Sequence, residues 1–101
     1  MLLGDTLTHT TEKYPDKTAI VNMNREITYS QLYKNALSLA NGLISENIHR
    51  GDRVAIYLEN SIESVISIYG ALKSDGVFLV INPHVKHKKL SFILNDCGVK
   101  F

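Results

Sequence analysis

The sequence has 101 residues, of which 45% are hydrophobic and 21% charged, as in one small globular domain. The 11 basic and 10 acidic residues give a net charge of +1, which argues against a nucleic-acid-binding protein, since such proteins usually carry a strong basic excess. The single cysteine excludes an intrachain disulfide and suits a reducing cytoplasm. No apolar run approaches the roughly 20 residues of a membrane span, and no secretory signal is evident. We therefore expect a cytoplasmic protein.

The N-terminal segment predicts a short helix and then a β-hairpin. Residues 3–13 suit a helix that Asp5 can cap. Pro15 marks its end, because the residue before a proline is pushed out of the helical region. The β-rich residues 18–21 and 26–28 flank a turn and are expected to pair as a hairpin.

The longest predicted helix follows the hairpin. Thr28 and Gln31 have the spacing of a capping box, in which each side chain bonds the other residue's backbone amide. Gly42 lies inside the helix and costs about 1 kcal/mol relative to alanine, so we expect it to allow close packing on a neighbouring element. Apolar residues recur at helical spacing: Leu32, Ala36, Leu39, Ala40, Leu43 and Ile44.

A strand–helix–strand unit comes next. The nearly unbroken apolar run 54–58 predicts a parallel strand covered on both faces. Asn60 and Glu63 can form a second capping box for the following helix, and Asp75-Gly76 supplies a turn before the apolar strand 77–81. The first strand lacks the glycine-rich turn of nucleotide-binding crossover units, so this unit is interpreted as framework.

The C-terminal residues predict one more helix, 86–95, and the start of a third strand, Val99–Phe101. The fold class is therefore α/β. We expect a mainly parallel sheet of Arg53–Leu58, Val77–Ile81 and Val99–Phe101, with flanking helices, a right-handed crossover and the hairpin at one side. Because a self-contained domain rarely stops inside a strand, residues 1–101 are expected to be a single partial domain.

Several residues invite a functional interpretation, and each has a structural alternative. The helix start at Asn60-Ser61 could hold an anion, but self-capping is favoured. His84 and His87 have metal-compatible spacing without a third ligand nearby, so an exposed loop is favoured. With those histidines, three lysines form a small basic patch that could touch a phosphate of coenzyme A, although a solvated face is favoured: Lys86, Lys88 and Lys89.

Other candidates have similar alternatives. Cys97 could be a nucleophile, but it has no histidine close in sequence. Tyr57 and Tyr69 are interpreted as core aromatics rather than substrate contacts, and Asp52 and Asp16 as turn residues rather than acids. The dinucleotide-binding and P-loop glycine patterns are absent from the sequence.

Five motifs, in order and at the usual spacing, resemble those that open the adenylate-forming (AMP-binding) acyl-CoA synthetase and ligase superfamily. Glu59 and Val80 stand where the family often has proline, and Asp75 where it often has glycine, so the subfamily is not assigned. The motifs span almost the whole chain: Tyr14–Ala19 (YPDKTA), Ile27–Leu32 (ITYSQL), Gly51–Ser61 (GDRVAIYLENS), Leu72–Pro83 (LKSDGVFLVINP) and Leu90–Lys100 (LSFILNDCGVK).

The resemblance implies a longer parent enzyme that uses ATP and Mg²⁺ to convert a carboxylic acid to an acyl-adenylate. A thiol, of coenzyme A or of a carrier protein's pantetheine, then displaces AMP, as in fatty acid metabolism. In this family the phosphate loop, the nucleotide contacts and a catalytic lysine all lie downstream. We therefore assign no catalytic, cofactor-binding or metal-ligating residue here, and regard Thr28, Tyr29 and Lys73 as parts of structural motifs.

The leading hypothesis is thus an N-terminal fragment of an AMP-dependent acid–thiol ligase, inactive alone, with the rest of the parent polypeptide as its partner. The alternative is a free-standing α/β binding module whose open strand edge binds a partner. A weaker third option is a small enzyme acting through Cys97 or a histidine. An open sheet edge also predicts self-association.

Overall fold

The N-terminal part of the chain folds as the sequence predicts. The computed structural model describes residues 3–59 and 61–101. Helix α1 (Leu3–Lys13) precedes the hairpin of β1 (Thr18–Asn22) and β2 (Arg25–Thr28), whose strands pair antiparallel with one irregularity near residue 19. Helix α1 begins at residue 3, so Asp5 lies within its first turn. The prediction that Asp5 caps the helix is therefore wrong.

Helix α2 (Tyr29–Ser45) begins with the predicted capping box. The Thr28 hydroxyl accepts a bond from the Gln31 amide at 3.2 Å, and the Gln31 side chain accepts one from the Thr28 amide at 2.9 Å. The prediction for Gly42 is wrong, since this glycine is exposed and nothing lies within 4 Å of an added Cβ. The close approach occurs at Gly70, where an added Cβ would lie 2.6 Å from Leu39 Cδ2.

The strand–helix–strand unit consists of β3 (Arg53–Ile56), α3 (Ile62–Lys73) and β4 (Val77–Val80). The two strands pair in parallel, with Arg53 opposite Val77 and Ile56 opposite Val80. Both strands are shorter than predicted, because the chain turns away from the pairing after residues 56 and 80. The observed capping box of α3 is formed by Ser61 and Ser64, one residue later than predicted, and Asn60 lies outside the described residues.

The turn before β4 needs a left-handed backbone conformation at one residue and room for close packing at the next. Asp75 adopts the left-handed conformation, with φ of 64°. Gly76 provides space, because a Cβ there would lie 3.0 Å from Ile48 Cδ1 and 3.2 Å from the Ala71 and Asp52 carbonyl oxygens. The sequence predicted a turn at Asp75-Gly76, and the structure shows that Asp75 adopts the left-handed conformation whereas Gly76 allows the close packing.

Helix α4 (His87–Asp96) follows β4 and has no buried side chain. Beyond it, Val99 forms a single parallel bridge with Arg53, and the Phe101 carbonyl accepts a bond from the Ala55 amide at 2.8 Å. The predicted third strand therefore pairs beside β3, although only as a bridge. The described strands form two separate two-stranded sheets, the hairpin and the β3–β4 pair.

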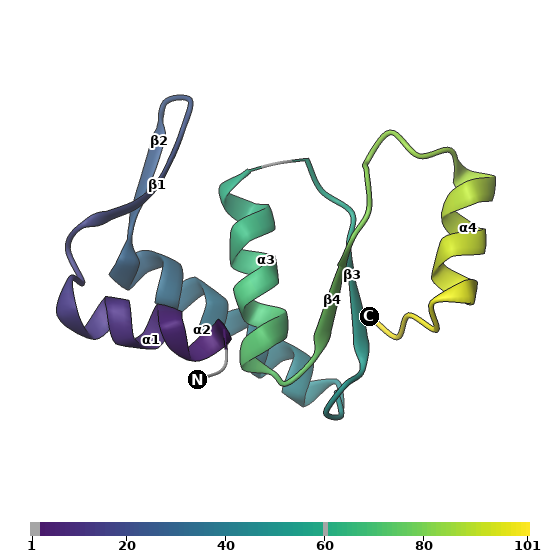
Figure 1. Cartoon of the computed structure of the whole chain (residues 1–101), viewed down its shortest axis with the longest axis horizontal. Helices are drawn as coiled ribbons and strands as arrows, with labels where there is room; N and C mark the ends of the chain where they lie inside the picture. The colour runs from purple at the N-terminus through teal and green to yellow at the C-terminus, as the bar shows by residue number, and fades with distance from the viewer. Residues whose placement is uncertain (1–2, 60) are drawn as a thin grey trace.

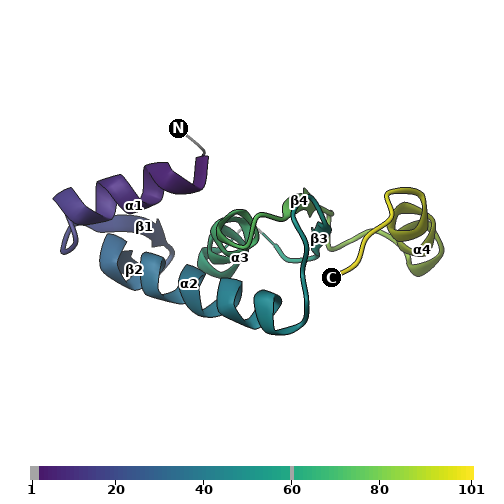
Figure 2. The same cartoon turned by 90° about the horizontal axis from the view of Figure 1, so that it is seen from below.

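The helices and strands are arranged in layers around two apolar clusters. Figures 1 and 2 show α3 and α2 on one side of the β3–β4 pair and α4 on the opposite side, with α1 and the hairpin at the far end. One cluster joins Leu7, Leu32 and Ala36 to residues of the hairpin and α3. The other joins Leu43, Val54 and Ala71, so helices α2 and α3 cover the inner sheet face. The cover on both faces that was predicted for residues 54–58 holds for the paired part of the strand, where Val54 and Ile56 are buried and Ala55 is half-buried, but not for Tyr57 and Leu58, which are exposed.

Candidate functional site at the carboxyl ends of the parallel strands

The carboxyl ends of β3 and β4 form the best candidate site in the described part of the chain. Ligands of open α/β sheets bind outside the carboxyl ends of the strands, where the connecting loops diverge. A hollow of about 370 Å³ lies at this edge, between the loops that follow the two strands. Its lining mixes four apolar residues with one carboxylate, one amide and one imidazole: Leu58, Glu59, Val80, Ile81, Asn82, Pro83 and His84.

Tyr57 holds the two loops together. Its hydroxyl donates to the Pro83 carbonyl at 2.8 Å and lies 3.2 Å from the Val85 carbonyl. Asn82 shapes the second loop, because its side-chain oxygen accepts a bond from the His84 amide at 2.9 Å. The sequence predicted an aromatic ring with its hydroxyl at the edge of the core. The prediction of a core aromatic is wrong for Tyr57, because the residue is 42% exposed and its hydroxyl bonds across the site.

The carboxylate and the imidazole of the hollow face each other. His84 Nε2 lies 3.4 Å from Glu59 Oε1, and these side chains are 80% and 72% exposed. An ion pair so exposed contributes little to stability, because water and salt screen it. The His84–Glu59 contact therefore brings an acid and a potential base together at the mouth of the hollow without desolvating either.

The amino end of α3 lies beside the first loop and is closed by its own side chains. The Ser61 hydroxyl accepts from the Ser64 amide and donates to the Glu59 carbonyl at 2.9 Å. The Arg25 guanidinium, from the hairpin, donates to the Glu63 carboxylate. That hydrogen bond, aided by a backbone amide, holds the pKa of Glu63 below its ordinary value of 4.5. Self-capping thus accounts for this helix start, as favoured from sequence.

The residues of the hollow do not fit ATP–Mg²⁺, the cofactor that the resemblance implies for the parent. A triphosphate needs outward-pointing amides or cations, whereas the Ser61 and Ser64 amides are taken up by capping and Glu59 adds negative charge. Among the residues that the structure describes, no group of three or more His, Cys, Asp and Glu is placed to hold a metal ion. What the hollow can do chemically is contact an apolar or neutral portion of a ligand.

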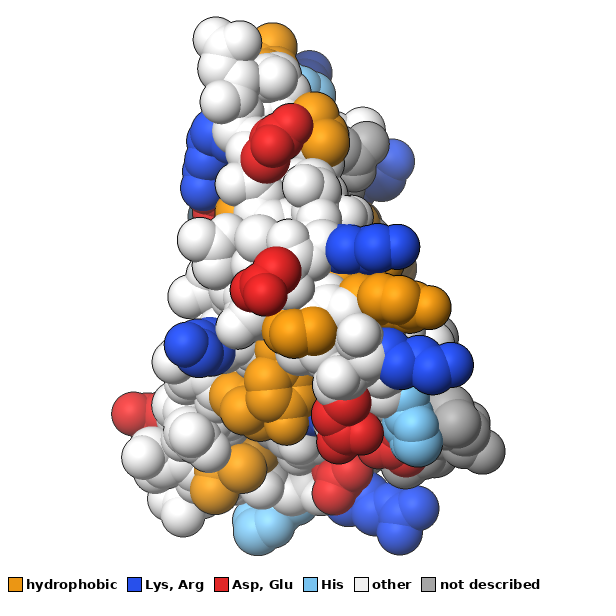
Figure 3. Space-filling model, turned by 90° about the vertical axis from the view of Figure 1, so that its left-hand side faces the viewer, with side chains coloured by type: hydrophobic (Ala, Val, Ile, Leu, Met, Phe, Trp, Pro, Cys, Tyr) orange, Lys and Arg blue, Asp and Glu red, His pale blue; other side chains and the backbone are white. Residues whose placement is uncertain are grey.

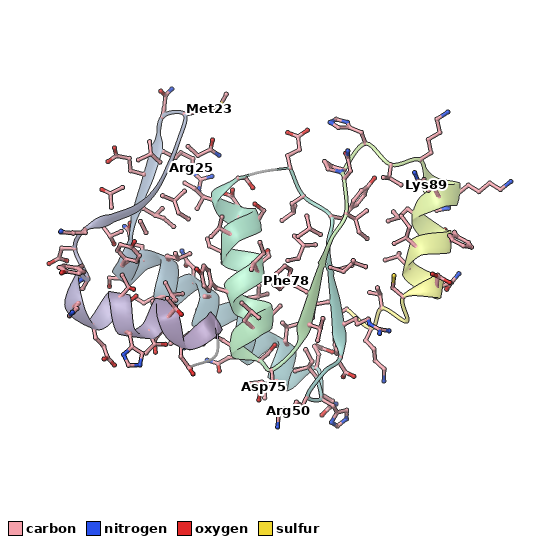
Figure 4. All side chains as sticks on the ribbon, viewed as in Figure 1. Met23, Arg25, Arg50, Asp75, Phe78 and Lys89 are labelled. Carbon is pink, nitrogen blue, oxygen red and sulfur yellow. The ribbon has the colours of Figure 1, made fainter. Side chains whose placement is uncertain are left out.

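The remaining residues considered from sequence lie outside the hollow. Cys97 is half-buried after α4, where its carbonyl accepts a bond from Arg53. Lys73 donates to the Thr8 hydroxyl, and its ammonium lies 5.4 Å from the centre of the Tyr33 ring, so it ties α1, α2 and α3 together. The lysines around His87 are exposed, and Figure 4 shows Lys89 pointing away from the sheet. No helix in the described ranges is long and apolar enough to cross a membrane.

Three long-range contacts carry no signal in the sequence. They are the Tyr57 bonds to the second loop, the Arg25–Glu63 pair and the Lys73–Thr8 bond. Each joins residues at least 26 positions apart, so no local spacing could have indicated them. Figure 3 shows acidic and basic side chains interspersed on the face of α1 and the hairpin, so the described residues of this face form no patch of one charge.

A family model described as AMP-binding enzyme matches residues 7–101. The chain belongs to the family of AMP-binding enzymes. It is 36% identical over 97 residues to a long-chain-fatty-acid–CoA ligase of Bacillus subtilis, and 34% identical over 89 residues to tyrocidine synthase 1 of Brevibacillus parabrevis. These alignments cover 96% and 88% of this chain, but only 17% and 8% of the relatives' own lengths.

Solved structures of the family show the same fold. A Mycobacterium tuberculosis fatty acyl CoA synthetase matches with a TM-score of 0.90 and 34% identity, over 98% of this chain and 20% of that one. The N-terminal subdomain of Klebsiella oxytoca NpsA, in complex with anthranilyl-AMSN, matches with a TM-score of 0.90 and 26% identity, over 97% of this chain and 26% of that one. The predicted fold class, a partial N-terminal subdomain of an adenylate-forming enzyme, is confirmed.

Proposed function

We propose that this chain forms one wall of the large N-terminal domain of a longer AMP-forming acid–thiol ligase. The observation that carries the proposal is where the family motifs lie in the structure. They form the capping box of α2, the capped start of α3, the Asp75 turn and the Tyr57-clamped loop after β4. All of these positions shape the backbone, and none pairs a nucleophile with a base.

The reaction proposed for the parent has two steps. The carboxylate of an acid attacks the α-phosphorus of ATP, forming an acyl-adenylate and releasing pyrophosphate, with Mg²⁺ balancing the phosphate charge. A thiol, of coenzyme A or of a carrier protein's pantetheine, then takes the acyl group and releases AMP. Relatives named as fatty-acid–CoA ligases and as peptide synthases support this class of reaction. We propose a fatty acid as the substrate and the cytoplasm as the location.

The chain's own contribution is to hold the strand ends and the hollow in place. The apolar residues of the hollow suit part of a substrate or of a neighbouring segment, whereas its lining does not suit a triphosphate. We propose that the chain alone does not catalyse adenylation and acts through the rest of the parent polypeptide.

Acid-dependent exchange between ATP and pyrophosphate, measured on the longer polypeptide that contains this chain, tests the proposal. A panel of fatty acids of different lengths, aromatic acids and amino acids would serve as substrates. We expect exchange with one class of acid, followed by AMP release when coenzyme A or a pantetheine thiol is added. A folded polypeptide that exchanges with no acid in the panel would contradict the proposed reaction, and strict preference for amino acids would replace the proposed substrate.

A further inference from the structure

Helix α1 is anchored to the start of α2 just beyond its carboxyl end. The Tyr29 amide donates to the Lys17 carbonyl at 3.0 Å, and the Ser30 amide donates to the Pro15 carbonyl at 2.9 Å. Figures 1 and 2 show α1 at the end of the molecule away from the β3–β4 pair. A movement of α1 by itself would therefore turn about residues 14–17.

The side chains of α1 offer limited packing against α2 and α3. Of residues 5–13, whose burial the structure describes, only Leu7 is buried. The Thr10 and Thr11 hydroxyls donate to the carbonyls of Thr6 and Leu7, so these two bonds stay inside the helix. Apolar contact between α1 and the other helices is therefore centred on one leucine, which packs in the N-terminal apolar cluster.

The packing beneath α1 is also incomplete. A hollow of about 220 Å³ lies among α1, β1, α2 and α3, and its lining includes Leu7, Ile20 and Tyr69. Side chains around a hollow lose contacts that a close-packed interior would provide. The contact between α2 and α3 is closer, since a Cβ added at Gly70 would lie 2.6 Å from Leu39 Cδ2. We therefore expect α1 to be docked less firmly than α2 and α3 are docked on each other.

Lys73 makes a polar contact from α3 to both α1 and α2. Its ammonium donates to the Thr8 hydroxyl of α1 and lies 5.4 Å from the centre of the Tyr33 ring of α2. The lysine is half-buried and lies in the last turn of α3, where a cation suits the helix dipole. A charged donor forms a stronger hydrogen bond than a neutral one, and the aromatic face attracts the same charge. The Lys73–Thr8 bond therefore adds a strong contact where apolar packing is sparse.

We propose that α1 is a strap that opens about residues 14–17 while the rest of the fold stays intact, and that the Lys73–Thr8 bond is its latch. Opening breaks this bond and withdraws Leu7 from its apolar cluster, so the lining of the hollow becomes accessible. It leaves the α2–α3 contact at Gly70 in place, together with the second cluster around Val54. Every contact that breaks on opening joins elements within residues 3–73. The charge of Lys73 thus sets how often this apolar surface is uncovered.

Amide hydrogen exchange, followed by mass spectrometry on the folded polypeptide that contains this chain, tests the strap without reference to enzymatic activity. Peptides of α1 should exchange at least about tenfold faster than those of residues 39–45 in α2, after correction for intrinsic rates, because α1 opens separately. Lys73→Met keeps the apolar stem but removes the donor and the charge, and should speed the exchange of α1 by about tenfold. The matched control is Lys34→Met, at an exposed lysine of α2, which should leave the exchange unchanged.

A substitution in the second cluster separates a latch from a general loss of stability. Val54→Ala weakens contacts that the opening of α1 does not break, so it should speed the exchange of residues 39–45 and leave that of α1 unchanged. Thr8→Val removes the acceptor and should speed the exchange of α1 as Lys73→Met does, with no further increase when both changes are combined. Circular dichroism checks that the variants fold.

Three results would overturn the strap. One is equal exchange of α1 and of residues 39–45 in the wild type. Another is an exchange of α1 that Lys73→Met does not change. The third is an exchange of α1 that Val54→Ala speeds as much as Lys73→Met does, because α1 would then open only when the whole fold unfolds.

Discussion

The two ends of the molecule differ in how completely they bury their apolar residues. At the N-terminal end, α1, the hairpin, α2 and α3 close around Leu7, Leu32 and Ala36, whose side chains are at most 3% exposed. At the C-terminal end, Val77, Val80 and Phe92 are at least 50% exposed, and α4 buries no side chain. Because buried apolar area stabilises a fold, we expect the first region to contribute more to the stability of the chain than the second. The predictions below test that division, from the largest expected effect to the smallest.

Truncating one large apolar side chain in each region tests the contrast most strongly. Leu32→Ala removes a buried side chain from the N-terminal cluster and should cost about 2–5 kcal/mol of unfolding free energy, because it leaves a cavity. Phe92→Ala removes a side chain that is 68% exposed and should change stability by less than about 0.5 kcal/mol. Urea unfolding of both variants measures this. Similar losses at the two positions would mean that the C-terminal region is packed more tightly than described.

Gly42 in α2 and Gly70 in α3 provide a matched pair. Gly70→Ala would place a Cβ 2.6 Å from Leu39 Cδ2 and 2.9 Å from Leu39 Cβ, so we expect a loss of about 1–3 kcal/mol from overpacking. Gly42→Ala meets nothing within 4 Å and should gain about 1 kcal/mol from helix propensity. Thermal unfolding should therefore shift in opposite directions for the same substitution. A gain at residue 70 would show that the α2–α3 contact is looser than the structure indicates.

Backbone conformation predicts a smaller effect at the hairpin tip. Met23 has a φ of 57° and is 95% exposed. The left-handed conformation is unfavourable for a residue with a Cβ, and the exposed side chain makes little packing contact to offset this cost. Met23→Gly should stabilise the chain by up to about 1 kcal/mol, whereas Gly51→Ala, at a φ of 85°, should destabilise it by a similar amount. Chemical denaturation resolves both changes. Destabilisation by Met23→Gly would imply that the methionine side chain has a partner.

The Arg25–Glu63 pair predicts the smallest effect, a change with pH. The bond from Arg25 lowers the pKa of Glu63 from 4.5, so the pair stabilises the fold above that value and its contribution is lost as the pH falls through the lowered pKa. Wild type should therefore be more stable than Glu63→Gln near neutral pH, with the difference shrinking as the pH falls below 4.5. Urea unfolding of both proteins across this range tests the sign. A difference that grows on acidification would contradict the assigned cause.

Local signals explain most of what the sequence predicted correctly. The Thr28–Gln31 capping box, both parallel strands and the turn at Asp75 depend on neighbouring residues, and the structure confirms them. Ser61 caps α3 where Asn60 was expected, because adjacent polar residues can serve the same helix start and local spacing does not rank them. The close packing expected at Gly42 occurs at Gly70 instead, and only the tertiary contact with Leu39 distinguishes the two glycines.

The candidate site was less predictable than the fold. The motifs indicated that this part of the family carries framework, and the positions of those motifs at caps and turns agree with that. The hollow itself was not predicted, because it depends on two loops separated by a helix and held by the Tyr57 hydroxyl. Pairing across such a separation depends on how β3 and β4 align in space, which no local spacing encodes.

The central claim is that this chain supplies structure to an adenylate-forming enzyme and no chemistry of its own. ATP–pyrophosphate exchange by the purified 101-residue chain, with the acid that the longer polypeptide uses, tests it most directly. The account predicts no acid-dependent exchange above the protein-free background while the chain remains folded by circular dichroism. Clear exchange by the chain alone, dependent on the acid and abolished by heat denaturation, would contradict it.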